Sequence, residues 1–151
     1  IGTGDWSSDV CSSDLEELML DIISWGEANL EENNHSLAEC YNKIAVIYRS
    51  INQNEKAVPY LKKQIETLQD IDGVNSLSVA EAVNSLAGAY MGLENFKEAE
   101  SLILQSLRIR TERLGNHHPN TIASKVKLGL LHSLKGEFDI AETIYSEIEL
   151  T

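Results

Sequence analysis

The chain has 151 residues, 42% hydrophobic and 24% charged, which suits one compact domain or one short repeat array and argues against disorder. Twelve basic against 24 acidic residues give a formal charge of −12, which disfavours nucleic acid and membrane surfaces as partners because both attract basic proteins. Two cysteines cannot build a disulfide framework, so we expect a cytoplasmic protein, and no apolar run approaches the ~20 residues of a membrane span.

The first 14 residues differ from the rest of the chain in composition. Residues 1–15 read IGTGDWSSDVCSSDL, which follows neither the helical nor the strand period and resembles the translation of a sequencing-adaptor read-through. We therefore expect residues 1–14 to be a non-native or disordered segment. A capping-box pattern predicts that the first helix begins at Ser13 or Asp14.

Residues 15–31 predict an amphipathic helix. Their apolar stripe consists of Leu15, Leu18, Met19, Ile22 and Ile23. Most of the negative charge lies in the same part of the chain, because residues 1–35 hold nine acidic residues and no Lys or Arg. The rest has fifteen acidic and twelve basic residues, a net charge of only −3 that is ordinary for a helical surface.

A period of 42 residues organises the remainder of the chain. Small residues recur at this step in two independent sets: Ala45, Ala87 and Gly129, and then Ala57, Ala99 and Ala141. A fixed period of this length is typical of stacked supersecondary units. We therefore divide the chain into a partial unit and three further units: residues 15–34, 35–76, 77–118 and 119–151.

Each unit predicts two antiparallel helices separated by turn residues. The small residues would lie where the two helices cross closely, and the wider gaps would be filled by Tyr48, Tyr90, Phe96 and Phe138. No unit can bury its apolar stripe alone, so neighbouring pairs must stack into an all-α array. We interpret the chain as a fragment cut at both ends, whose uncovered apolar stripes favour self-association.

The unit pattern resembles tetratricopeptide repeats. The matching residues of the unit 35–76 are Tyr41, Ile44, Ala45, Tyr48, Ala57 and Leu61. The usual period is 34, whereas the 42-residue spacing and the run from Leu114 to Thr121 look like the kinesin light chain subtype. The resemblance implies a right-handed superhelical solenoid of antiparallel helix pairs, in which the first helix of each pair lines a concave groove.

The same resemblance implies a set of partner-binding positions on the concave face: Glu39, Asn42, Lys43, Val46, Arg49, Glu81, Asn84, Ser85, Met91, Val126 and Lys127. Asn42 and Asn84 match an asparagine that often hydrogen-bonds the backbone of an extended peptide in kinesin light chain-like arrays. Val126 departs from that pattern. Arg49 and Lys127 would meet acidic side chains of the partner.

Other chemistry has little support in the sequence. The pair His117-His118 lies on the inter-unit His-Pro loop of the resembled family and has no further ligands at metal-binding spacing. No nucleophile and base are placed by a motif, so we predict no enzyme activity, no cofactor and no metal. The favoured function is a scaffold that binds a protein segment in the groove. The alternative is a regulatory or sensor segment of a larger signalling protein, packed against its own domains.

Overall fold

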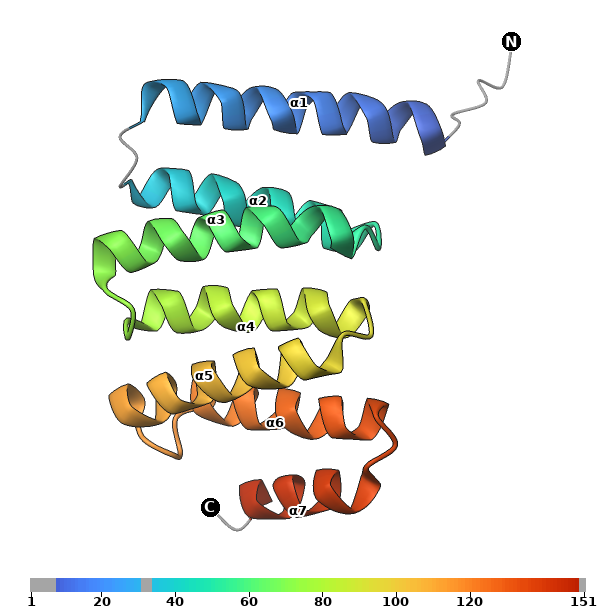
Figure 1. Ribbon diagram of the computed structural model, residues 1–151, viewed down its shortest axis with the longest axis vertical. Helices are drawn as coiled ribbons and strands as arrows, with labels where there is room; N and C mark the ends of the chain where they lie inside the picture. Colours follow the sequence, from blue (N-terminus) through green and yellow to red (C-terminus); the bar gives the residue numbers. More distant parts are fainter. Residues whose placement is uncertain (1–7, 31–33, 150–151) are drawn as a thin grey trace.

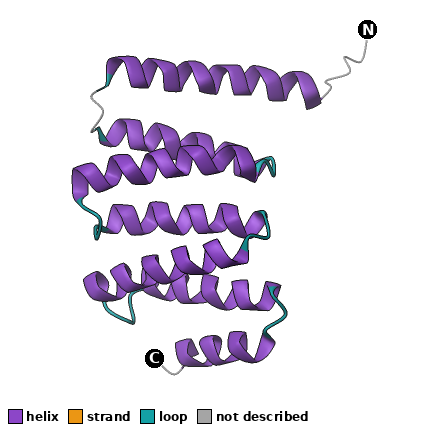
Figure 2. Ribbon diagram, viewed as in Figure 1, coloured by secondary structure: helices purple, strands orange, loops and turns teal. Residues whose placement is uncertain are grey.

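A computed structural model describes residues 8–30 and 34–149, and the side chains of 14–30 and 34–148 (Figures 1 and 2). This part of the chain forms seven helices and no strand, which confirms the all-α prediction. The helices are α1 (Ser8–Asn29), α2 (His35–Ser50), α3 (Asn54–Asp72), α4 (Leu77–Gly92), α5 (Phe96–Leu114), α6 (Pro119–Leu134) and α7 (Phe138–Glu149). They lie one below another in chain order, with α1 and α7 at opposite ends (Figure 1).

The helix starts repeat the 42-residue step of the sequence. The first helices of the three pairs, α2, α4 and α6, begin at His35, Leu77 and Pro119. The second helices, α3, α5 and α7, begin at Asn54, Phe96 and Phe138. Residues 42 apart therefore occupy equivalent places in successive helix pairs.

Each first helix begins with a side-chain cap. Asn34 accepts a 2.8 Å hydrogen bond from the amide of Ser36, and Ser76 caps α4 in the same way. At α6 the ring of His118 accepts from the amide of Asn120, and a proline opens the first turn.

The start of α1 differs from the prediction. The backbone is helical from Ser8, so the expected start at Ser13 or Asp14 was wrong by one to two turns. The serine- and aspartate-rich composition hid this helix, because its stripe of apolar residues begins only at Leu15. Residues 1–7 lie outside the described residues, and the foreign origin of the segment 1–14 stays a prediction.

The small residues of the repeat lie at tightly packed crossings. Ala45, Ala57, Ala87 and Ala99 are all fully buried. Gly129 is the extreme case, because a Cβ at this position would lie 2.6 Å from Cε1 of Tyr145 on α7. Any larger residue would therefore displace the Tyr145 ring or push α6 and α7 apart.

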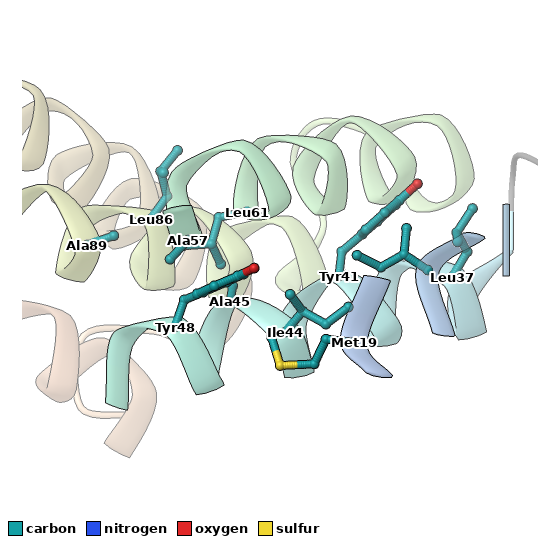
Figure 3. Packing of buried hydrophobic residues seen from close by; sticks show 11 residues of the cluster. Met19, Leu37, Tyr41, Ile44, Ala45, Tyr48, Ala57, Leu61, Leu86 and Ala89 are labelled. Carbon is teal, nitrogen blue, oxygen red and sulfur yellow. The ribbon is translucent and has the colours of Figure 1, made fainter. Parts of the chain in front are cut away.

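The largest buried cluster joins four helices (Figure 3). Tyr41, Ile44 and Tyr48 of α2 form its centre, and Leu61 of α3 is fully buried beside them. Met19 enters from α1, and Leu86 and Ala89 enter from α4. Because one cluster spans neighbouring helix pairs, the pairs share a continuous core, as stacking requires.

Two Glu–Tyr–Lys clusters hold α1 against the first pair. Glu16 accepts hydrogen bonds from the hydroxyl of Tyr48 (3.1 Å) and from Lys56 (2.7 Å). Three turns further along α1, Glu27 accepts from Tyr41 (2.8 Å) and Lys63 (2.7 Å). Hydrogen bonds from the lysine and the tyrosine lower the pKa of each glutamate. Burial, together with Glu16, raises the pKa of Tyr48 to about 12.

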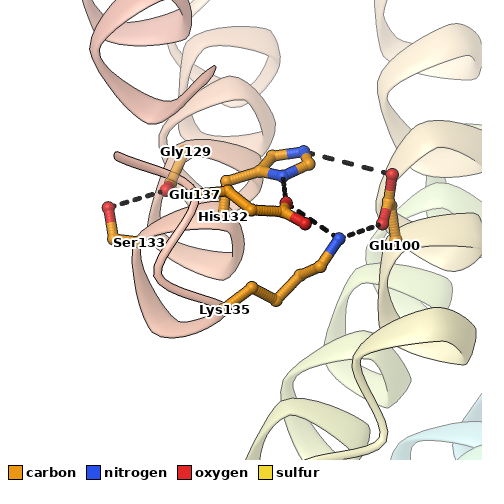
Figure 4. A network of polar contacts seen from close by, with 6 residues as sticks. All are labelled: Glu100, Gly129, His132, Ser133, Lys135 and Glu137. Carbon is orange, nitrogen blue, oxygen red and sulfur yellow. Dashed lines mark hydrogen bonds and ion pairs between the residues drawn. The ribbon is translucent and has the colours of Figure 1, made fainter. Parts of the chain in front are cut away.

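A polar network replaces the aromatic residue in the last pair (Figure 4). His132 is equivalent to Tyr48 and Tyr90, is buried, and donates from Nδ1 to Glu137 over 2.6 Å. Lys135 contacts Glu137 (2.9 Å) and Glu100 of α5 (3.2 Å). Packing and hydrogen bonding therefore account for this histidine.

The expectation for Phe138 was wrong. Its equivalent Phe96 packs against a cluster that contains Ile103 of α5 and Leu131 of α6. Within the described chain no further helix lies beyond α7, and Phe138 is 68% exposed. At the opposite end, Trp25 of α1 is 62% exposed.

Candidate functional site

The first helices α2, α4 and α6 carry the predicted partner-binding positions, and we call their common surface the first-helix face. A pocket of about 220 Å³ lies on it between α2 and α4, and we call it the α2/α4 pocket. Four predicted residues line it: Glu39, Asn42, Glu81 and Ser85. It also contains residues that the sequence analysis did not select, among them His35, Gln64, Leu68 and Ser78.

Acceptor atoms dominate the chemistry of the α2/α4 pocket. Gln64 is 8% exposed, and its side-chain oxygen Oε1 is buried without a hydrogen-bond donor among the described residues. Glu81 is exposed and forms no ion pair with a described residue. Glu39 pairs with Lys43 over 2.9 Å on the exposed surface of α2. A hydrogen-bond donor or a positive charge would therefore find several partners here.

Asp72 accepts hydrogen bonds from two residues that line the α2/α4 pocket. Ser78 donates a hydrogen bond to one of its carboxylate oxygens, and His35 Nε2 donates to the other over 3.0 Å. The hydrogen bond from Ser78, supported by His35, lowers the pKa of Asp72. This carboxylate is thus ionised at neutral pH and adds negative charge beside the pocket.

The other half of the first-helix face is basic. Lys127 of α6 donates a 2.8 Å hydrogen bond to the backbone oxygen of Asn84. Burial, reinforced by the positive charges of Arg49 and Arg110, lowers the pKa of Lys127 to about 8. We call Arg49, Arg110 and Lys127 the basic cluster.

Arg49 crosses from α2 to α4. Its guanidinium lies against Gly88, where a Cβ would come within 2.6 Å of Nη2, so the glycine makes room for it. The group is half-buried, which lowers its pKa, and it forms no hydrogen bond or ion pair with a described residue. One turn before Gly88, the amide oxygen Oδ1 of Asn84 is buried and also lacks a donor in the described chain.

Arg110 reaches the basic cluster from the second helix α5. It is 6% exposed, and its Nη1 donates to the backbone oxygen of Asn120 and to Oγ of Ser124, each over 2.9 Å. Sequence reasoning missed Arg110 and Gln64, because it searched only the first helices for binding residues. The signal was present in the 42-residue register, where Leu68 of α3 is replaced by Arg110 of α5.

The remaining predicted residues lie outside these two places. Val46 and Val126 are exposed apolar residues of α2 and α6, and Lys43 is engaged by Glu39. Met91 is half-buried and packs against the core between α4 and α6. The role of each predicted position in partner binding stays a prediction.

Two searches over the described residues bear on other chemistry. No group of three His, Cys, Asp or Glu side chains there is arranged to hold a metal ion. None of the helices within that part combines the length and the hydropathy needed to cross a bilayer.

Family comparison covers most of the helix pairs. Residues 78–148 match one model of the tetratricopeptide repeat, and residues 38–67 match a second model of the same repeat. The two matches comprise 71 and 30 residues, or 101 of 151. No curated protein matches the chain significantly.

Solved structures share the fold over nearly the whole chain. BtubC (BKLC) from P. vanneervenii is 24% identical with a TM-score of 0.78, over 88% of this chain and 53% of that chain. Two structures of a protein described as a kinesin light chain with nearly identical TPR-like repeats, from Podosopora anserina, are 22% and 21% identical, with TM-scores of 0.78 and 0.76. They cover 89% and 87% of this chain and 63% of each of those chains, so this chain spans between about half and two-thirds of its neighbours.

Proposed function

We propose, since the chain is an array of tetratricopeptide repeats with a kinesin light chain-like fold, that its first-helix face binds an extended segment of a partner protein. Repeats of this family serve generally as protein-interaction scaffolds, and we assign the chain no catalytic role. We also propose a cytoplasmic location, on the sequence argument from its cysteines.

The observation that carries the proposal is the state of Asn84. Its Oδ1 is buried without a donor among the described residues, which costs about 1–3 kcal/mol in the free protein. When the Asn84 side chain turns to present this oxygen to the face, a backbone N–H of an extended segment would supply the missing hydrogen bond, and the amide nitrogen would donate to the next backbone carbonyl. Asn42 is equivalent to Asn84, lines the α2/α4 pocket and forms no side-chain hydrogen bond within the described residues, so an available asparagine amide repeats along the face.

Charge adds a preference for part of the segment. Arg49 and Lys127 are half-buried cations that lie against successive turns of α4, at Gly88 and Asn84. Each pays for burial without a carboxylate partner in the described chain, so an acidic side chain of the bound segment would relieve both.

The experiment is a selection followed by quantitative binding. Random 12-residue peptides are displayed on phage and selected against the whole chain, and the selected peptides are measured by fluorescence polarisation. Asn84→Ala should weaken binding about fivefold or more, because one hydrogen bond to the peptide is lost. The matched control is Asn116→Ala, which changes an exposed asparagine in the loop before α6. Equal affinities for the wild type and Asn84→Ala would count against the proposed face.

A further inference from the structure

We propose that the α2/α4 pocket receives a basic side chain of the bound segment, and that an arginine guanidinium fits it best. This inference rests on the proposed function, because it names a specificity site within the same face. It is carried by a comparison of the α2/α4 pocket with the equivalent place between α4 and α6.

The two places are related by the 42-residue step. Leu68 and Ser85, which line the α2/α4 pocket, are equivalent to Arg110 and Lys127. Gln64 is equivalent to Ser106 of α5. The place between α4 and α6 thus carries two basic side chains at the positions where the α2/α4 pocket has a leucine and a serine.

Between α4 and α6 the chain supplies its own cations. Arg110 donates to a backbone oxygen and a hydroxyl of α6, and Lys127 donates to the backbone oxygen of Asn84. Ser106 is also satisfied, because its hydroxyl donates to the backbone oxygen of Ala80 over 2.7 Å. The chain thus supplies its own cations at this place, although Oδ1 of Asn84 and the hydroxyl of Thr121 have no donor or acceptor partner among the described residues.

Between α2 and α4 the equivalent space is open. It forms the pocket of about 220 Å³, and Gln64, one of its lining residues, has a buried side-chain oxygen without a donor among the described residues. Glu39 and Glu81 add two carboxylates: Glu39 pairs with Lys43 on the exposed surface of α2, whereas Glu81 forms no ion pair with a described residue. A cation from outside would take the place that Arg110 and Lys127 fill in the next pair.

The acceptors favour an organic cation that carries several donors. A guanidinium presents five N–H donors in one plane, so it can bond Gln64 and a carboxylate at once. A metal ion is a poorer match, because no three acidic, histidine or cysteine side chains of the described chain converge on one point. The basic groups nearby are Lys43, which pairs with Glu39, and Arg110, whose charge acts on Glu81, while the His35 ring is hydrogen-bonded to Asp72.

The first-helix face therefore has an acidic part and a basic part. Acceptors and carboxylates lie near the start of α2 and α4, whereas Arg49 lies near the end of α2 and Lys127 on α6. A segment with one basic and one acidic residue at the matching separation would bind in one direction only, because reversal places like charges together.

The test uses a peptide from the selection described above whose binding depends on Asn84. Each arginine of the peptide is replaced by citrulline, which keeps the shape and removes the charge, and separately by lysine. Affinities are measured for the wild type, Gln64→Met, Ser85→Lys and the control Glu98→Gln, an exposed acid on α5. Ser85→Lys copies the residue of the next pair into the pocket. Circular dichroism melting verifies that each variant is folded.

We expect citrulline at one position to weaken binding to the wild type and to Glu98→Gln about tenfold, and lysine to weaken it less. In Ser85→Lys and Gln64→Met the same replacement should cost under about threefold, because the pocket is filled or has lost its free acceptor. Asn84-dependent peptides without a basic residue, or an equal citrulline effect in every variant, would overturn the pocket assignment alone. Peptides whose binding ignores Asn84→Ala would overturn the proposed function.

Discussion

Lys127 on α6 donates a hydrogen bond to the backbone oxygen of Asn84 on α4, over 2.8 Å. The contact joins the first helices of two successive pairs directly, although the second helix α5 lies between them in the sequence. It also places a lysine whose pKa is lowered to about 8 beside an asparagine whose side-chain oxygen has no donor in the described chain. The centre of the proposed binding face is therefore both charged and incompletely paired.

The lowered pKa of Lys127 predicts how stability depends on pH. In the unfolded chain a lysine has a pKa near its ordinary value, about 10.4, so between pH 8 and that value the unfolded state binds more protons than the folded state. The free energy of unfolding of the wild type should therefore rise relative to Lys127→Met as the pH increases through this window. Thermal melting at pH 7, 8, 9 and 10 measures the difference. Lys97→Met, which removes an exposed lysine of α5, is the matched control. A wild-type-minus-Lys127→Met difference that stays constant with pH would contradict the burial of this charge.

The effect of Gly129→Ala on stability should be opposite in sign to the usual effect of this substitution in a helix. Glycine to alanine in a helix ordinarily stabilises by about 1 kcal/mol. At Gly129 the added Cβ would lie 2.6 Å from the ring of Tyr145, so Gly129→Ala should instead destabilise the protein by about 1–3 kcal/mol. Chemical denaturation measures the change, and Tyr145→Ala in the same chain should remove most of the additional cost. A more stable Gly129→Ala variant would show that α6 and α7 do not approach as closely as described.

Neutralising Glu16 and Glu27 of α1 should release this helix locally from the first helix pair. Glu16→Gln with Glu27→Gln weakens both Glu–Tyr–Lys clusters, so α1 should exchange its amide hydrogens faster while α4 and α5 keep their protection. Because hydrogen bonds lower the pKa of both glutamates, their contribution is present above their ordinary pKa and is lost as the pH falls through the lowered values. Acid should therefore release α1 of the wild type before the remaining helices unfold.

Hydrogen exchange with mass spectrometry follows both effects. The control is Glu17→Gln, which changes an exposed neighbour on the same helix. Uniform exchange across α1 to α5 at every pH would show that the clusters do not fasten α1.

Replacing Gln64 by methionine should raise the stability of the free protein, although it weakens the recognition of a basic side chain in the α2/α4 pocket. Its buried oxygen lacks a donor in the described chain, so Gln64→Met should leave the fold intact and stabilise the free protein by about 1 kcal/mol or more. The control Gln69→Met changes a glutamine on the same helix that does not line the α2/α4 pocket. Denaturation midpoints compare the two. A loss of stability confined to Gln64→Met would mean that its oxygen is already paired in the free protein.

The 42-residue period was sufficient to predict the helix pairs and the buried small residues. Ala45, Ala87 and their equivalents could be located because close helix crossings tolerate only small side chains. Phe138 could not be placed in the same way, because its equivalent Phe96 packs against residues of the next helix pair, such as Leu131, whereas Phe138 has no such contact within the described residues.

The candidate site was only partly predictable. Glu39, Asn42, Glu81 and Ser85 were identified from one face of the first helices, and the structure brings them together. Gln64 and Arg110 come from second helices, and their importance depends on which polar atoms find partners. That is decided by side-chain geometry between helices, which the period of a sequence does not describe.

The most direct test of the central claim is the map of a bound peptide on the whole chain. Backbone NMR spectra of the labelled protein are recorded while a selected, Asn84-dependent peptide is added. The account predicts that the largest shifts cluster on α2, α4 and α6, around Asn42, Asn84 and Lys127. Shifts confined to α3, α5 and α7, with these three residues unchanged, would contradict it.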